Sequence, residues 1–158
     1  MMLMKETGES LGACQCGVFE RPCSRSRRRF IMVARVFPMW PSNGRLIGLK
    51  DILRLVGDNC WEWRIHDLEG TGSLPYGMSW DEFDEKVDAV PYVLAWSDLV
   101  NLADGLVQVT NGEIRAICAG EEMARIAAFD SSEWTVDLRV NEVCDFEDRL
   151  DRLLADAA

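Results

Sequence analysis

The chain has 158 residues and a formal net charge of −10, with 48% apolar and 28% charged residues. This balance is typical of a folded globular domain and excludes an intrinsically disordered chain. The overall negative field repels nucleic acids and anionic membranes, so neither is an expected partner. The sequence also contains no apolar run of the length that a transmembrane helix needs.

The charge is unevenly distributed along the chain. Residues 1–44 hold seven Lys or Arg against three Glu, whereas residues 45–158 hold ten against twenty-four acids. Residues 1–29 have no sustained helical or strand period, so we interpret 1–44 as a disordered or non-native basic leader. Three cysteines in this leader lack the fourth ligand that a structural zinc site needs. We expect residues 45–158 to form a single acidic domain.

The expected domain begins with a helix and a strand. Apolar residues recur at three- and four-residue spacing over residues 46–56, which predicts an amphipathic helix that ends at Gly57. Trp61, Trp63 and Ile65 then alternate with polar residues, which predicts a half-buried strand. The two tryptophans of this strand are expected in the core.

Residues 67–73 (DLEGTGS) are predicted to form a loop. Its glycines are compatible with a phosphate-binding loop, but no basic residue lies nearby and Asp67 and Glu69 would repel a phosphate. An EF-hand calcium loop would fit Gly72 at its sixth position, but its twelfth position is Met78 rather than glutamate. We interpret the segment as a strand-to-helix connection and expect no metal and no cofactor.

A helix is predicted over residues 80–90. Ser79 can cap its N-terminus, and Glu82 can complete a capping box from three residues further on. Phe83 supplies the inner face, and Pro91 ends the helix. A short strand or extended link and a short helix are expected next, at residues 92–96 and 98–104.

The last third of the chain predicts strands and a closing helix. Segments 106–110 and 113–117 flank Asn111-Gly112, a dipeptide that favours the type I′ turn of a hairpin. A second hairpin and an amphipathic helix are expected after it, at residues 124–140 and 141–154. The whole order predicts an α+β fold: a mostly antiparallel sheet of four to six strands, helices packed on one face and a C-terminal helix.

The sequence contains no catalytic motif that we can identify. His66, the only histidine, and the adjacent Asp67 are the candidates for acid–base chemistry, although neighbouring residues of a strand point to opposite faces. A nucleophile elbow is absent from the sequence, so the pattern favours a protein without enzymatic activity. Cys60, Cys118 and Cys144 lie on or beside apolar phases, where cysteines are usually buried, and three cysteines in the domain favour a reducing, cytoplasmic location over a disulfide framework.

The main functional hypothesis is a non-enzymatic domain that binds a basic protein partner. Trp80 stands at a helix start among acids, and exposed aromatic residues surrounded by acids are good anchors for such a partner. In size and charge the chain is similar to bacterial immunity and antitoxin-type proteins. The residues predicted to bind the partner are Asp67, Glu69, Trp80, Asp81, Glu82, Asp84 and Glu85.

Two alternatives stay open at this point. For Trp80 itself, the sequence favours a role in the core or as a lid over the sheet. The chain is also compatible with a small enzyme or a ligand- or metal-binding domain, which would have a cleft at the 67–79 loop and use His66, Asp67 and Glu69.

Overall fold

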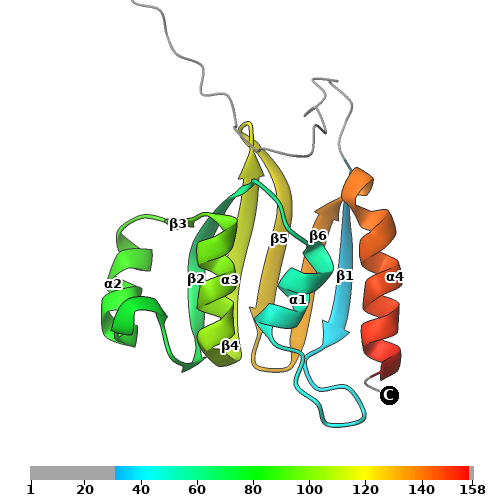
Figure 1. Cartoon of the computed structure of the whole chain (residues 1–158), viewed down its shortest axis with the longest axis horizontal. Helices are drawn as coiled ribbons and strands as arrows, with labels where there is room; N and C mark the ends of the chain where they lie inside the picture. Colours follow the sequence, from blue (N-terminus) through cyan, green and yellow to red (C-terminus); the bar gives the residue numbers. More distant parts are fainter. Residues whose placement is uncertain (1–30, 157–158) are drawn as a thin grey trace, which may run out of the picture.

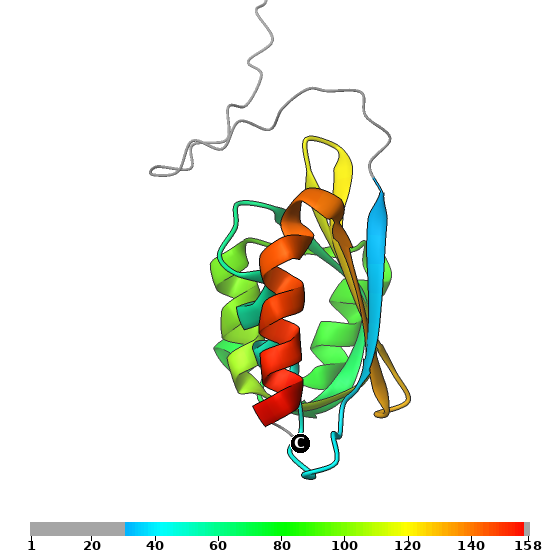
Figure 2. The same ribbon diagram turned by 90° about the vertical axis from the view of Figure 1, so that its right-hand side faces the viewer.

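The computed structural model describes residues 31–156, apart from the side chains of residues 140–144. It contains one six-stranded antiparallel sheet, in the order β1-β6-β5-β4-β2-β3. Helices α1, α3 and α4 cover one face of this sheet, and α2 lies at its β2–β3 end (Figure 1). The view turned by 90° shows the helical layer on one side and the sheet on the other (Figure 2). The predicted α+β class, with helices on one face and a C-terminal helix, is confirmed.

The elements have the following bounds. The strands are β1 Met32–Pro38, β2 Glu62–Gly72, β3 Tyr92–Leu94, β4 Leu106–Cys118, β5 Glu121–Phe129 and β6 Glu133–Arg139. The helices are α1 Leu49–Val56, the short 3-10 helix η1 Pro75–Gly77, α2 Trp80–Ala89, α3 Trp96–Gly105 and α4 Val140–Asp156. Within residues 31–156, none of these helices is both long and apolar enough to cross a membrane.

The core lies between the sheet and the helices. Alternate residues of each strand point toward the helices, so that Trp63, Ile65 and Trp134 are almost completely buried. The predicted inward positions of Trp63 and Ile65 are confirmed, whereas Trp61 is only partly buried against the core. The buried indole N–H of Trp134 donates a hydrogen bond of 2.8 Å to the Ile47 carbonyl, which satisfies its polar atom inside the core.

The folded part begins before the boundary expected at residue 45. Strand β1 pairs with β6 along its whole length, from Met32 opposite Arg139 to Pro38 opposite Glu133. Met39 is completely buried, and its carbonyl accepts a hydrogen bond of 2.8 Å from the Ile47 amide. The positive charge of this part of the sequence is therefore not a sign of disorder over residues 32–38. The segment is ordered because pairing with β6 satisfies its backbone hydrogen-bonding groups. The predictions for residues 1–30 lie outside the described residues.

The hairpin predicted at Asn111-Gly112 is wrong. Strand β4 runs without a break through both residues, which pair with Glu69 and Leu68 of β2. The Asn111 side chain bonds across the sheet instead of turning the chain, since it accepts from the Asp130 amide at 3.0 Å. Tertiary pairing with a long neighbouring strand has overridden the local turn preference of the dipeptide.

The loop predicted at residues 67–73 is largely strand. Strand β2 continues to Gly72 and contains three register shifts, the first of them at His66 between Ile65 and Asp67. A Cβ atom at Gly70 would collide with the Gln108 carbonyl oxygen of β4, so the glycine permits close approach of two strands. The glycine-rich composition thus reflects bulges in a strand rather than a connection.

Candidate functional site

Helix α2 begins with the capping box predicted from the sequence. The Ser79 hydroxyl accepts a hydrogen bond of 3.2 Å from the Glu82 amide, and the Ser79 amide donates one of 2.9 Å to the Glu82 carboxylate. The hydrogen bonds from the backbone and side chain of Ser79 lower the pKa of Glu82. Glu82, predicted to contact a partner, therefore already has a structural role in the cap.

Trp80 lies at the first position of α2 and is partly buried against the core. Its ring meets that of Phe83 edge-on, with the centroids 5.8 Å apart and an interplanar angle of 76°. Phe83 in turn packs edge-on against Tyr92 at 5.8 Å. Trp80 thus belongs to a row of aromatic rings that joins α2 to β3, which is the core or lid role left open above.

The acidic residues predicted to bind a partner are drawn from two elements. Asp67 lies on β2 and is exposed, and it lies close enough to the acids of α2 for their charges to act on it. Burial, followed by the charge of Glu69, raises the Asp67 pKa, and the charges of Asp84 and Asp88 add to this rise against a hydrogen bond from the Leu68 backbone. We define the acidic surface as the exposed carboxylates Asp67, Asp81, Asp84, Glu85 and Asp88.

The acidic surface lies in the most negatively charged part of the chain. Residues 65–114 contain ten Asp or Glu and a single Lys or Arg, which is Lys86. Among the described residues, no carboxylate of the acidic surface makes a salt bridge with a basic side chain. Glu69 differs from this group, because it accepts a hydrogen bond of 3.1 Å from the Asn111 side chain.

His66 is exposed at the first bulge of β2. Within residues 31–156 its imidazole makes no hydrogen bond or ion pair with another side chain, and it lines none of the three cavities described below. The structure thus brings no nucleophile or carboxylate into hydrogen-bond contact with His66. Acid–base catalysis by His66 and Asp67 stays a prediction without a supporting geometry.

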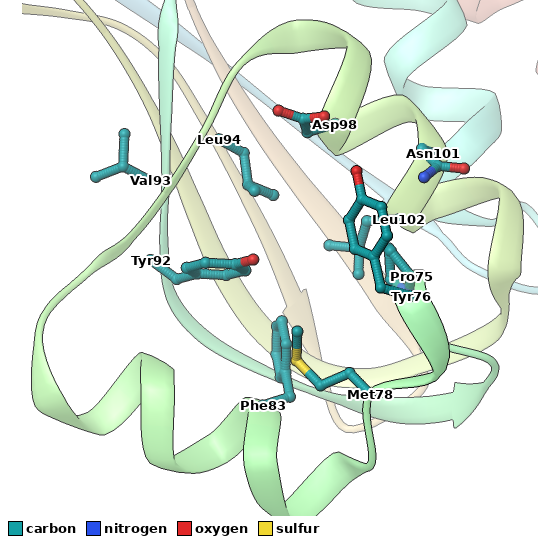
Figure 3. Close-up of a pocket in the computed structure, with 10 residues that line it drawn as sticks. All are labelled: Pro75, Tyr76, Met78, Phe83, Tyr92, Val93, Leu94, Asp98, Asn101 and Leu102. Carbon is teal, nitrogen blue, oxygen red and sulfur yellow. The ribbon is translucent and has the colours of Figure 1, made fainter.

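A cavity of about 190 Å³ opens between η1, α2, β3 and α3 (Figure 3). The rings of Tyr76 and Tyr92 flank it on opposite sides, Phe83 and Met78 lie below, and Asp98 lies above (Figure 3). The other residues that line it are Pro75, Val93, Leu94, Asn101 and Leu102. It is a mainly apolar site with a few polar groups at its rim, which is the usual character of a binding pocket.

Tyr76 is the most unusual residue of this cavity. Its backbone has φ 60° and ψ 21°, the left-handed region that a tyrosine seldom adopts, and its side chain is 88% exposed. Such a conformation costs about 1–2 kcal/mol and persists where the surrounding chain imposes it. Here it lies between Pro75 and Gly77, and the result is an aromatic ring held at the mouth of an apolar cavity.

The cleft expected at the 67–79 loop is therefore divided between two places. Pro75, Tyr76 and Met78 line the cavity just described, whereas Asp67 and Glu69 line a separate hollow of about 480 Å³ over the sheet. Within the described part of the chain, no cluster of three or more His, Cys, Asp or Glu residues is placed to hold a metal. The third cavity, of about 170 Å³, lies between α1, α3 and β4.

The second group of charges lies on the outer sheet face, which is the face turned away from α1, α3 and α4. Arg64, Arg115 and Arg125 occupy adjacent register positions on β2, β4 and β5. Glu113 accepts hydrogen bonds from Arg115 Nε at 2.7 Å and from Arg125 Nε at 3.0 Å. Burial alone would raise the Glu113 pKa, but the hydrogen bonds from these two arginines outweigh it and lower the pKa.

Sequence reasoning missed the aromatic cavity. Tyr92 and Asp98 cannot be recognised as cavity residues from the sequence, because their neighbours in space come from α2 and η1 rather than from adjacent positions in the chain. The only local signal was an aromatic residue, Tyr76, placed between a proline and a glycine.

Comparison with known proteins adds no further assignment to this site. No protein-family model, no curated protein sequence and no solved structure matches the chain.

Proposed function

We propose that this protein is a non-enzymatic interaction domain that binds a basic segment of another protein through the acidic surface. The observation that carries the proposal is a group of five exposed carboxylates without salt bridges in the described structure, beside an apolar cavity. Unpaired like charges repel one another, and a basic partner would relieve that repulsion while being steered to the surface.

The position of the charges supports this proposal further. Asp84 and Asp88 act on Asp67 strongly enough to contribute to the rise of its pKa, so carboxylates from α2 and β2 share one field. A basic partner would favour the ionised form of Asp67, and all of these acids would attract it together. The apolar cavity beside them supplies a site for an anchoring side chain, since buried anchors carry most of the affinity in protein interfaces.

The test is a pull-down from the native host with a charge-reversed bait. We expect the double variant Asp84→Lys, Glu85→Lys to bind the recovered partner about tenfold more weakly than the native chain, because rim charges govern electrostatic association. The wild-type complex should also weaken as salt is raised. Affinities are measured with the purified partner by calorimetry.

The matched control makes the same change of charge on α4. Asp148 and Asp156 are exposed on this helix, and the double variant Asp148→Lys, Asp156→Lys should retain the native affinity. An equal loss in both double variants would show a response to net charge alone, and no loss in either would remove the acidic surface from the interface. Both results contradict the proposal.

The reducing, cytoplasmic location is part of the same proposal. It is supported by the three cysteines of the domain, Cys60, Cys118 and Cys144, which favour a reducing compartment over a disulfide framework. Cys60 is exposed rather than buried, and an exposed thiol is compatible with a reducing compartment.

A further inference from the structure

The cavity between α2, β3 and α3 combines aromatic rings with negative charge. Phe83, Tyr92 and Tyr76 contribute three rings to its lining, and Asp98 contributes a carboxylate at its rim (Figure 3). The faces of aromatic rings carry a negative partial charge and attract cations within about 6 Å of the ring centre. A cavity lined in this way favours an organic cation over a neutral apolar group of the same shape.

An ammonium group within the chain already illustrates this attraction. Lys86 Nζ lies 5.8 Å from the centroid of the Tyr92 ring, although Lys86 does not line the cavity. Lys86 is also the only Lys or Arg between Arg64 and Arg115. Residues 75–102, which supply the lining of the cavity, hold six Asp or Glu against Lys86, and this net negative charge favours the approach of cations.

Asp98 has an ordinary structural explanation as well. It lies in the first turn of α3, where a carboxylate stabilises a helix through its dipole. That role does not explain why three rings surround a cavity beside it. It also does not explain why Tyr76 is held over the mouth in a strained backbone conformation with 88% of its surface exposed.

We propose that this cavity is a socket for the side chain of a lysine from the basic partner. The apolar stem of the lysine would pack on Pro75 and Met78, which are partly exposed, and its ammonium group would lie between the tyrosine rings and near the Asp98 carboxylate. This inference rests on the proposed function and specifies its anchoring residue. A lysine is named because its compact ammonium group ends an apolar four-carbon stem that the apolar lining can cover, whereas arginine carries a bulkier planar guanidinium that a cavity of about 190 Å³ fits less well.

The first experiment uses small probes with the full chain. Nα-acetyl-lysine N-methylamide is titrated into the labelled protein, and the ring resonances of Tyr76, Phe83 and Tyr92 are followed by NMR. We expect saturable shifts, with affinity at least about fivefold higher than for the norleucine analogue, which has the same stem without the charge. The arginine analogue is expected to bind more weakly than the lysine compound.

Variants then assign the binding to this cavity. Tyr76→Ala and Asp98→Asn should each lower the affinity for the lysine probe about threefold. Tyr76→Phe should retain the native affinity, because the aromatic ring remains. Lys86→Met should strengthen binding about twofold, since a competing positive charge is removed. Phe129→Ala is the control, because Phe129 is an exposed aromatic residue, 66% accessible, at the end of β5, which is separated from β3 by β4 and β2, and it lies outside this cavity.

The outcomes separate this inference from the proposed function. Equal affinity for the lysine and norleucine probes, or unchanged affinity in Tyr76→Ala and Asp98→Asn, would overturn the lysine socket. If the lysine probe failed but charge reversal at Asp84 and Glu85 still lowered the affinity for the partner, the proposed function would stand without the lysine socket. If charge reversal had no effect while the lysine probe bound in the cavity, the acidic interface would fail instead.

Discussion

The two charged surfaces of this protein differ in whether their charges are paired. On the outer sheet face, arginines of adjacent strands are bonded to glutamates, as in the contact of 2.6 Å between Arg115 and Glu113. On the acidic surface, Asp81, Asp84 and Glu85 are exposed and make no salt bridge with any described residue. The charges of the outer sheet face are therefore paired within the protein, whereas those of the acidic surface are not.

This difference shows which charges the fold uses. Three arginines in neighbouring register positions would repel one another across the sheet, and Glu113 offsets that repulsion by bonding to two of them. Among the carboxylates of α2, Glu82 bonds to the helix cap, and the others make no comparable contact with the rest of the fold. Charges that the fold does not need are the ones available to a partner, so stability and binding should respond to different substitutions.

The largest expected contrast is between Glu113→Lys and Asp84→Lys, which change the net charge equally. Glu113→Lys should lower the free energy of unfolding by about 2–3 kcal/mol, because it leaves a fourth positive charge among half-buried arginines. Asp84→Lys should change it by no more than about 0.5 kcal/mol. Urea unfolding at pH 7 measures both values. Equal destabilisation by the two substitutions would remove the distinction between the surfaces.

A smaller effect on stability is expected within α2, where Glu82 takes part in the capping box and the other acids do not. Ser79→Ala should destabilise the protein by about 1 kcal/mol, since the first turn of α2 loses its cap. Asp81→Asn, which lies in the same turn without capping, should cost only a few tenths of a kcal/mol through the helix dipole. Thermal unfolding compares the two variants, and amide exchange should locate the Ser79→Ala loss in α2. A greater loss from Asp81→Asn would contradict the assigned cap.

The smallest effect is expected at Asp67. Because its pKa is raised in the folded protein, ionisation of Asp67 opposes folding, and Asp67→Asn should slightly raise Tm at pH 7. The gain should shrink as pH falls through the raised pKa and vanish below the ordinary value of 3.8, where the native carboxyl is neutral in both states. Melting curves from pH 3 to 7 test this. A destabilised variant at pH 7 would indicate that Asp67 has a favourable partner.

Some local features could be predicted because the residues that make them are close in sequence. The Ser79–Glu82 cap spans three residues and is present in the structure. The end of α1 at Gly57 follows from a glycine with φ 82°. The hairpin between β5 and β6 was also expected, and it turns through Asp130 and Ser131, which both have positive φ.

Other features depended on partners that the sequence does not place. Asn111-Gly112 is a strong turn signal by itself, but the extended β2 offers backbone partners to both residues, and the pairing keeps the strand continuous. The glycine-rich 67–73 segment is a bulged strand up to Gly72 because it takes part in the same pairing. Both differences have one cause, because β2 and β4 form long strands by pairing with each other, and neither segment shows its partner in its own residues.

The α+β class, the alternating core strands and the acidity of the segment around α2 can be read from the order of residues, because period and composition are local properties. The pairing of charges and the meeting of aromatic rings around a cavity depend instead on the folded arrangement of the chain. Glu113 finds its arginines across strands, and Tyr76, Phe83 and Tyr92 come together from η1, α2 and β3. Such contacts depend on strand register and helix packing, which the order of residues alone does not reveal.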